Sequence, residues 1–358
     1  MKIVHCMYEM EIGGCEVLLV DLMNELCKNN DISLIILNNQ FDESLMRRLN
    51  KKVKVYCLKR KPGSRNPVSI FKFNLLLLKI RPDIVHCHVP SMIRIVRSWR
   101  FKVILTIHDV NIPLSFMHKY DYLVAVSDAV YLDIRSRCRY PIAKVNNGVP
   151  DSLFKKRKEY SLGEAKSLKL IQVSRLVHQK KGQDILLRAL YTLVYEYNVS
   201  NISIEFAGAG ESMQYLKDLT STLKLVEHVS FPGERSRDWL YSHLSEYHAL
   251  IQPSRYEGFG LTIVEGLKAG LPVVASNIDG PAQILTGLPA GFLFEIGSGA
   301  SCARQIMLLF NLYKNGKLTD MMKTITLQEK PYYSMAACSD GYVEVYKKVI
   351  NNSQALHT

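Results

Sequence analysis

The segment Ser254-Arg-Tyr-Glu257-Gly-Phe-Gly-Leu-Thr-Ile-Val-Glu265 is the most informative stretch of the chain. Glu257 precedes a Gly-x-Gly turn, and Glu265 lies about one turn inside the helix that the apolar run predicts. Glycine lets backbone N–H groups approach a ligand closely, and a helix N-terminus favours phosphate. The two carboxylates can then hold hydroxyl groups on either side of that phosphate. The segment therefore predicts a site for a ligand with phosphates in the middle and sugars at both ends, which is a nucleotide-sugar.

The composition is that of a globular protein with room for two cores. The chain has 358 residues, of which 47% are hydrophobic and 22% are charged. No run of 18 apolar residues occurs, so we expect no membrane span. Residues 1–7 are too short and too polar at their flanks for a signal peptide, and we expect a buried first strand there. Eight scattered cysteines form no Cys-x-x-Cys pair, which favours reduced thiols in a cytosolic protein.

Positive charge is concentrated in the first half of the chain. Residues 1–160 hold 27 Lys+Arg against 15 Asp+Glu, and residues 46–102 hold 16 basic residues and one acid, Asp83. This cluster is either a solvated face or a contact for anionic lipid or a diphosphate-bearing acceptor. Phe71, Phe73 and Trp99 lie within it, but no nucleic-acid motif does, so we expect no nucleic-acid partner.

Short apolar runs alternate with helical patterns in both halves, which predicts two doubly wound parallel sheets with a cleft between them. In the first half we expect strands at 2–7, 33–37, 53–58, 84–87, 103–107 and 122–126, and helices at 16–27, 91–99 and 128–137. A turn at 146–150 and a charged linker follow. In the second half we expect strands at 168–173, 202–206, 228–231, 249–252, 272–275 and 290–294, and helices at 182–197, 212–223, 260–269, 299–314 and 334–349.

Three glycine or basic loops follow predicted strands. The loop 174–182 contains Arg175, Lys180 and Lys181, whose charges suit a diphosphate, although a solvated loop would also explain them. Gly208-Ala-Gly210-Glu211 lacks the third glycine of the dinucleotide fingerprint, so we expect it to give backbone clearance near the ligand. Gly13-Gly14 is either a tight turn or a second place where amides approach a phosphate.

The histidines at strand ends could be metal ligands, ligand contacts or core residues. His86 and His88 share one face of a strand, but no further ligand has the spacing that a metal site needs. No Asp-x-Asp pair is present to hold Mg²⁺, so we expect no metal, and Arg, Lys and helix dipoles must neutralise the diphosphate. His108, at the end of strand 103–107, is either a core histidine or a ligand contact. Cys15 has no interpretation from the sequence.

In their order and spacing these motifs resemble the retaining glycosyltransferases of family 4. The resemblance covers nearly the whole chain and rests on the segments 12–16, 82–88, 106–109, 124–127, 147–149, 174–176, 181–182, 208–211, 231–233 and 253–266. It implies the GT-B fold, an α/β architecture of two Rossmann-like domains facing a central cleft. The implied domains are residues 1–158, on the acceptor side, and 165–333, which bind the nucleotide-sugar. A helix at about 334–350 would cross back onto the first domain.

The resemblance also implies roles for individual residues. Arg175 and Lys181 would hold the diphosphate as it leaves, with Gly182 favouring Lys181 over Lys180. Glu257 would hold the donor sugar, which His108 would also touch, and Glu265 would bind the ribose. The implied catalytic residues are Glu257, His108, Arg175 and Lys181. The remaining donor-binding residues are Gly13, Gly14, Gly210, Glu211, Pro232, Gly233, Gly258, Phe259, Gly260, Leu261, Thr262 and Glu265.

The function that follows is transfer of a hexose or N-acetylhexosamine with retention at C1, without a cofactor. No carboxylate is clearly placed as a nucleophile, and in the family retention is attributed to front-face attack. We expect a UDP-sugar donor, with GDP-mannose second. The expected acceptor is a saccharide or a polyprenyl-diphosphate-linked saccharide of surface polysaccharide synthesis. We also expect a cytoplasmic protein, peripheral on the inner face of an anionic membrane.

Two alternatives to a transferase stay open, and a third lacks its motif. A nucleotide-sugar epimerase could share the fold, and a non-catalytic protein could use the basic surface to bind a membrane. A nicotinamide oxidoreductase would need Gly-x-Gly-x-x-Gly after the first strand, and residues 8–14 lack it.

Overall fold

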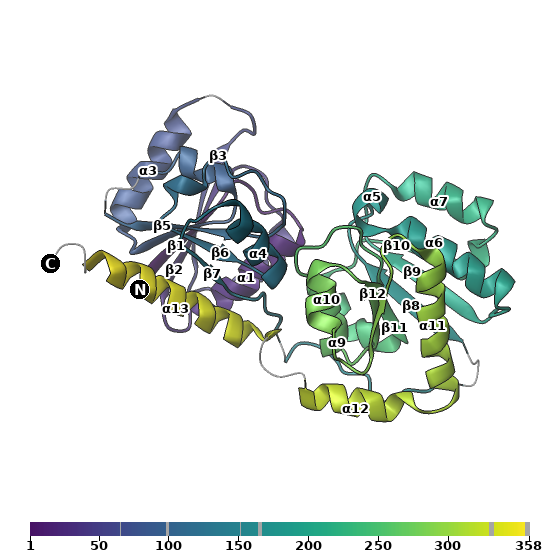
Figure 1. The fold of residues 1–358 in the computed structure, drawn as a ribbon. Helices are drawn as coiled ribbons and strands as arrows, with labels where there is room; N and C mark the ends of the chain where they lie inside the picture. Colours follow the sequence, from purple (N-terminus) through teal and green to yellow (C-terminus); the bar gives the residue numbers. More distant parts are fainter. Residues whose placement is uncertain (65, 98–99, 151, 164–166, 329–332, 355–358) are drawn as a thin grey trace. The chain divides into compact units, whose positions relative to one another are not determined.

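The protein consists of two compact units, each built around its own parallel sheet (Figure 1). The computed structural model describes residues 1–358 except 65, 98–99, 151, 164–166, 329–332 and 355–358. Unit 1 comprises Met1–Pro150 and Pro331–Thr358, and unit 2 comprises Asp151–Lys330. Unit 2 is therefore inserted between the first sheet and the last helix of unit 1. No helix in the described part of the chain is both long and apolar enough to cross a bilayer.

Unit 1 contains a seven-stranded sheet in the order β3-β2-β1-β4-β5-β6-β7. The inner strands are nearly continuous apolar runs, as expected for a parallel sheet, whereas the edge strands are more polar and less buried. The strands are β1 (Lys2–Met7), β2 (Asp31–Asn38), β3 (Lys54–Arg60), β4 (Ile84–Cys87), β5 (Lys102–Ile107), β6 (Tyr122–Ala125) and β7 (Ile142–Lys144). The helices are α1 (Gly14–Leu26), α2 (Glu43–Arg47), α3 (Val68–Ile80), η1 (Pro90–Arg94), η2 (Met117–Lys119), α4 (Asp128–Arg137) and α13 (Met335–Gln354).

Unit 2 contains a six-stranded parallel sheet in the order β10-β9-β8-β11-β12-β13. Its strands are β8 (Leu168–Val173), β9 (Ile202–Ala207), β10 (Val229–Gly233), β11 (Ala249–Gln252), β12 (Val273–Ser276) and β13 (Gly291–Phe294). Its helices are α5 (His178–Lys181), α6 (Gln183–Tyr191), η3 (Thr192–Glu196), α7 (Met213–Thr222), η4 (Val226–His228), α8 (Arg237–His243), η5 (Leu244–Glu246), α9 (Leu261–Lys268), α10 (Asp279–Leu285), α11 (Gly299–Lys314) and α12 (Leu318–Gln328).

The order of strands reverses at one point in each sheet, and this positions the candidate site. In unit 2 the first strand, β8, pairs with both β9 and β11, and in unit 1 β1 pairs with both β2 and β4. Connections therefore leave in opposite directions from these central strands. Ligands of open α/β sheets bind at such reversals, beyond the carboxyl ends of the strands.

Two of the predicted helices were wrong in extent. The predicted helix 91–99 is a short 3₁₀ turn, η1, which begins at Pro90 and closes with an Ile95 to Met92 hydrogen bond; residues 98–99 lie outside the described residues. The predicted helix 182–197 begins earlier and is interrupted. Gly182 has a φ of 67°, which ends α5 before α6 begins, and η3 continues α6 as a π-helical turn.

Helix α13 packs against α1 in unit 1 and completes its core (Figure 1). The side chains of Tyr342 and Tyr346 are almost fully buried. The chain enters α13 beside Val149, whose N–H and C=O bond to Tyr333 and Met335. A Cβ at Gly148 would overlap the carbonyl of Ser334, so this close approach of two backbones requires glycine.

Candidate active site

Three glycines of unit 2 hold the loops after β8, β9 and β11 against one another. A Cβ at Gly182 would overlap the carbonyl of Pro253. At Gly208 and Gly210 it would overlap the carbonyls of Ser174 and Leu176. The loops that carry the predicted basic residues and the predicted glutamates are therefore packed backbone to backbone, at the reversal of the sheet. Close approach of this kind admits only glycine.

This packing places Lys181 against Glu257. Lys181 Nζ donates a hydrogen bond of 2.6 Å to Glu257 Oε2, and the two side chains are 20% and 15% exposed. Because Lys181 is the last residue of α5, the short helix fixes its direction. Lys181 comes from the loop after β8, and Glu257 follows β11. The site thus joins a cation and a carboxylate from neighbouring strands.

Polar side chains that the sequence analysis missed hold Glu257 in place. Gln252 Nε2 and Ser254 Oγ donate to the same Glu257 oxygen, Oε2, at 3.2 and 3.3 Å. Thr262 Oγ1 donates to Gln252 Oε1 at 3.3 Å, which fixes the orientation of the amide. Within the described residues no donor reaches Glu257 Oε1. One carboxylate oxygen is therefore positioned by the protein, and the other can accept from a ligand hydroxyl.

Arg175, which follows β8 as Lys181 does, supplies a second cation. Its side chain is exposed, and no acidic side chain of the described residues forms an ion pair with it. Its backbone is anchored, because Gln183 Nε2 donates to the Arg175 carbonyl and to Ser174 Oγ. A guanidinium on an anchored backbone can take a phosphate in bidentate fashion.

A further arginine in the decisive segment is structural. Arg255 forms two hydrogen bonds of 2.8 and 2.7 Å to the carboxylate of Asp184, and its Nη1 also donates to the His178 carbonyl. Burial would raise the pKa of Asp184, but the bonds from Arg255 more than offset it, and the pKa lies below its usual value. Arg255 N–H also bonds to the Lys180 carbonyl. These bonds fasten the 253–257 segment to α5 and α6.

Helix α9 begins at the predicted turn. Gly260 has a φ of 104°, a conformation that strongly favours glycine, and it is the residue before α9. Gly258 and Phe259 are buried in the turn, and the backbone N–H groups of Leu261 and Thr262 start the helix. Amides in the first turn of a helix have no partner within the helix and favour an anion.

Glu265, the predicted ribose-binding residue, is buried. Its side chain is 4% exposed, and its Oε1 forms an ion pair of 2.6 Å with Arg237 on α8. The Arg237 guanidinium also lies over the ring of Tyr241, 5.1 Å from its centroid. The sequence analysis did not anticipate this partner, because Arg237 lies after a different strand, β10.

The other predicted donor-binding residues of unit 2 lie at the same edge of the sheet. Gly208 N–H bonds to the carbonyl of Gly233 at the end of β10. This bond joins the loop that contains Gly210 and Glu211 to the end of the strand that contains Pro232 and Gly233. Glu211 and Pro232 are exposed.

The predicted residues of unit 1 form a group of their own. Gly13 caps α1 in an extended conformation, and Gly14 is its first residue. Cys15 Sγ lies 3.3 Å from His108 Nε2, so the thiol and the imidazole are hydrogen-bonded. This contact gives Cys15 the interpretation that the sequence did not provide. Burial lowers the pKa of His108 to about 4, so its imidazole is neutral at pH 7.

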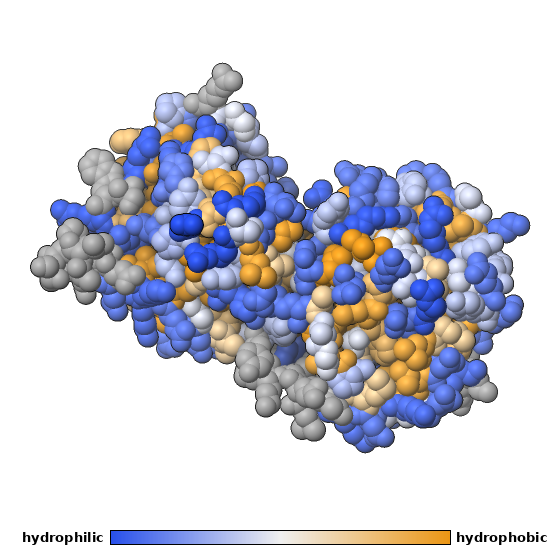
Figure 2. Space-filling view, in the orientation of Figure 1, coloured by the Kyte–Doolittle hydropathy of each residue, from blue (hydrophilic) through white to orange (hydrophobic). Residues whose placement is uncertain are grey.

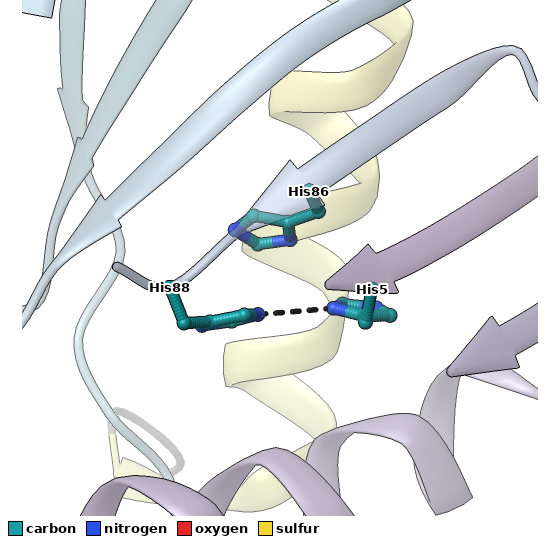
Figure 3. A group of neighbouring side chains, drawn as sticks. All are labelled: His5, His86 and His88. Atoms are coloured by element: carbon teal, nitrogen blue, oxygen red, sulfur yellow. Dashed lines mark hydrogen bonds between the residues drawn. The ribbon is translucent and has the colours of Figure 1, made fainter. Parts of the chain in front are cut away.

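His108 adjoins a buried network of histidines and hydroxyl groups. Figure 3 shows three of its members, His5, His86 and His88. His88 bonds to His108 at 3.4 Å and to His5 at 3.1 Å, and the rings of His86 and His88 stack with centroids 4.4 Å apart. The prediction that His86 and His88 share a face is thus confirmed. Burial lowers the pKa of His5 to about 3 and holds those of His86 and His88 well below the usual value.

Hydrogen bonding accounts for most of this network without a metal. Two groups of three side chains in the described residues bring ligand atoms within 4.8 Å of one another; they are His5, His86 and His88, and Cys15, His88 and His108. In the first group both nitrogens of His86 already bond, at 2.7 Å, to Tyr346 and Thr106 hydroxyls. A metal would have to displace one of these buried bonds. The second group surrounds one atom, His108 Nε2.

Two Rossmann-like units with polar loops at the reversals of their sheets are the architecture of the GT-B fold, and comparison with known proteins shows the family. Residues 154–326 match the family model described as glycosyl transferases group 1. Residues 12–153 match the model described as glycosyltransferase family 4. The chain belongs to this glycosyltransferase family.

Similar proteins show how far the likeness extends. An uncharacterised glycosyltransferase of Methanocaldococcus jannaschii is 25% identical over 233 residues, which are 64% of this chain and 60% of that protein. A GDP-mannose-dependent α-(1-6)-phosphatidylinositol monomannoside mannosyltransferase of Mycobacterium tuberculosis is 30% identical over 146 residues, 39% of this chain and 37% of that protein. The chain thus spans less than two thirds of these relatives.

The fold extends over the whole chain. The structure of HepE from Anabaena, in complex with UDP and glucose, superposes with a TM-score of 0.80 and covers 97% of this chain and 100% of that one. The two sequences are 19% identical, so this likeness concerns the fold.

Proposed function

We propose that the protein transfers a hexose or N-acetylhexosamine from a nucleotide-sugar to a saccharide or lipid-linked saccharide, with retention at C1. The observation that carries the proposal is the Lys181–Glu257 contact at the reversal of the unit 2 sheet. A cation for a diphosphate and a carboxylate for sugar hydroxyls are thereby adjacent, as a nucleotide-sugar requires. Arg175 follows the same strand, β8, as Lys181 does.

In this proposal each group acts on a different part of the donor. Arg175, Lys181 and the first amides of α9 hold the diphosphate and stabilise its charge as it leaves, so the reaction needs no divalent metal. Glu257 accepts hydrogen bonds from the sugar through Oε1. Glu265 holds the ribose while Arg237 balances its charge. Gly13, Gly14 and His108 also contact the donor, with His108 as a neutral hydrogen-bonding group.

The identity of the nucleotide is proposed on similarity. HepE was solved with UDP and glucose, and the mycobacterial relative is named as GDP-mannose-dependent. We favour a UDP-sugar and place GDP-mannose second. The basic first half of the chain would bring the protein to an anionic membrane surface that carries the acceptor.

A binding screen followed by product analysis tests the proposal. Thermal shifts with UDP, GDP and ADP identify the nucleotide, and the matching sugar nucleotides are then incubated with acceptors, with and without a chelator. Transfer to an acceptor with an α-configured product from an α-linked donor supports the proposal. Isomerised donor without transfer would make the protein an epimerase, and no binding of any nucleoside diphosphate would leave a non-catalytic surface protein.

A further inference from the structure

Helix α3 of unit 1 exposes hydrophobic side chains in a continuous stripe. Val68, Phe71, Leu75 and Leu78 are 50%, 68%, 54% and 56% exposed. Their spacing of three, four and three residues places them on one face of the helix. The opposite face, with Phe73 and Leu77, is buried. Single exposed hydrophobic residues are common on proteins, but a stripe of four on one helix indicates a binding surface.

The cations around this stripe indicate what binds there. Lys72 and Lys79 are exposed on the same side of α3, and α3 contains no acidic residue. Lys59 and Lys61 are exposed at and just beyond the end of β3, the strand that packs against α3. Among the described residues none of these four lysines forms an ion pair with a carboxylate. The surface around α3 is therefore hydrophobic at its centre and positive at its rim.

A third element extends the positive rim on the other side of α3. Asn74 Nδ2 donates to the Ile95 carbonyl at 2.9 Å, and Asn74 Oδ1 accepts from Arg97 N–H at 2.8 Å. These bonds fix residues 95–97 beside the helix, with the side chain of Arg97 exposed. Figure 2 shows hydrophobic residues surfacing among hydrophilic ones over the part of unit 1 that carries α3.

We propose that α3 is a membrane-binding helix that lies in the interface of an anionic bilayer, with Phe71, Leu75 and Leu78 inserted between the lipids. Apolar side chains in the acyl region and lysines at phosphate level are the requirements of an interfacial helix. A second copy of the chain fits less well, because a symmetric contact would bring Lys72 and Lys79 of both copies together. The inference deepens the membrane association in the proposed function and names the element that carries it.

Vesicle binding by the full-length chain tests the proposal. The parent should bind vesicles that contain phosphatidylglycerol more tightly than vesicles of phosphatidylcholine alone. Phe71→Gln/Leu75→Gln/Leu78→Gln should lower the partition coefficient at least about tenfold at both low and high salt, because it removes inserted apolar surface. Lys72→Gln/Lys79→Gln should weaken binding mainly at low salt. Leu132→Gln, on α4 of the same unit and 64% exposed in the parent, is the matched control and should bind like the parent.

Insertion has its own readout. A Phe71→Trp variant should show tryptophan quenching by brominated lipids beyond that of the parent. The proposal is overturned if the triple glutamine variant binds vesicles like the parent, or if light scattering shows a dimer that this variant abolishes while vesicles are not bound. UDP thermal shifts on every variant report folding and donor binding separately, so a failure of the proposed donor chemistry leaves the vesicle result intact.

Discussion

Lys181 and Glu257 have opposite charges that the proposed donor uses separately, one for phosphate and the other for sugar hydroxyls. The resemblance to family 4 glycosyltransferases implied that both residues belong to one donor site, and the structure places them in contact. The sequence could not show that Gln252, Ser254 and Thr262 fix the orientation of Glu257, because those contacts depend on how the segment after β11 turns back. The contacts of Cys15 with His108 and of Arg237 with Glu265 could not be predicted for the same reason, because the two partners in each pair follow different strands.

The cations and Glu257 should be essential for transfer but not for folding. Arg175→Ala, Lys181→Ala and Glu257→Ala should each lower kcat/KM by about 10²–10³-fold, the usual loss when a group that stabilises transition-state charge is removed. Lys180→Ala is the matched control and should stay within about threefold of the parent, because Lys181 is the residue that contacts Glu257. Steady-state kinetics with circular dichroism checks this, and full activity in all three variants would refute the site.

The buried Arg237–Glu265 pair should link stability to nucleotide affinity. Glu265→Leu should lower the free energy of unfolding by about 3–5 kcal/mol, because it leaves the Arg237 charge buried without its partner. Arg237→Met/Glu265→Leu should recover part of that loss. Urea unfolding measures both effects. If Glu265 holds the ribose, calorimetry should show that the recovered double variant still binds UDP weakly; parent-like affinity would count against that role.

The strands that the sequence predicted well are short apolar runs that the sheet buries on both faces. The predicted strands agree closely with β1, β4, β8 and β11, and the helix 128–137 matches α4. Helix α3 was not predicted, because its exposed face is as apolar as its buried one and the run of leucines at 75–78 hides the helical period. β7, with three residues, is too short to give a pattern.

Helix α13 should be held in unit 1 by its tyrosine hydroxyls as well as by its apolar surface. Tyr346→Phe should lower the free energy of unfolding by about 1–3 kcal/mol, because His86 Nδ1 loses its partner in the core. Tyr195→Phe removes an exposed hydroxyl that bonds to the Lys224 carbonyl, and it should change stability by less than about 0.5 kcal/mol. Chemical denaturation measures the change in the free energy of unfolding for each variant. Equal changes would show that the buried Tyr346–His86 bond contributes nothing to stability.

At the scale of the whole molecule, the first half of the chain combines most of the positive charge with a group of buried histidines. The formal charge of +13 arises almost entirely in the first half of the chain. That half also buries His5, His86 and His88 as neutral groups. Composition alone gave the charge, whereas the histidine network required the sheet and α13 to be assembled.

Stability should fall in mild acid. Because burial lowers the pKa of His5 to about 3 and that of His108 to about 4, the unfolded chain takes up protons first as the pH falls below about 6.5. The stabilisation is therefore complete above that pH and is lost as the pH falls toward the folded-state values, by up to about 1.4 kcal/mol per unit for each histidine.

Urea unfolding between about pH 7 and about pH 5 checks this dependence. His88→Gln should flatten the slope, whereas His118→Gln, at an exposed histidine on η2, should leave it unchanged. A free energy of unfolding that is constant across this range would contradict the assignment of buried neutral imidazoles.

The insertion of unit 2 between the sheet and the last helix of unit 1 has a consequence for synthesis on the ribosome. The nascent chain presents all seven strands of unit 1 and then all of unit 2 before α13 emerges. Until then His86 and Thr106 lack the tyrosine hydroxyls that close their network. Domains that are complete can fold during translation. We therefore expect unit 2 to reach its native state first, and unit 1, whose strands are synthesised earlier, to be completed only when α13 has emerged.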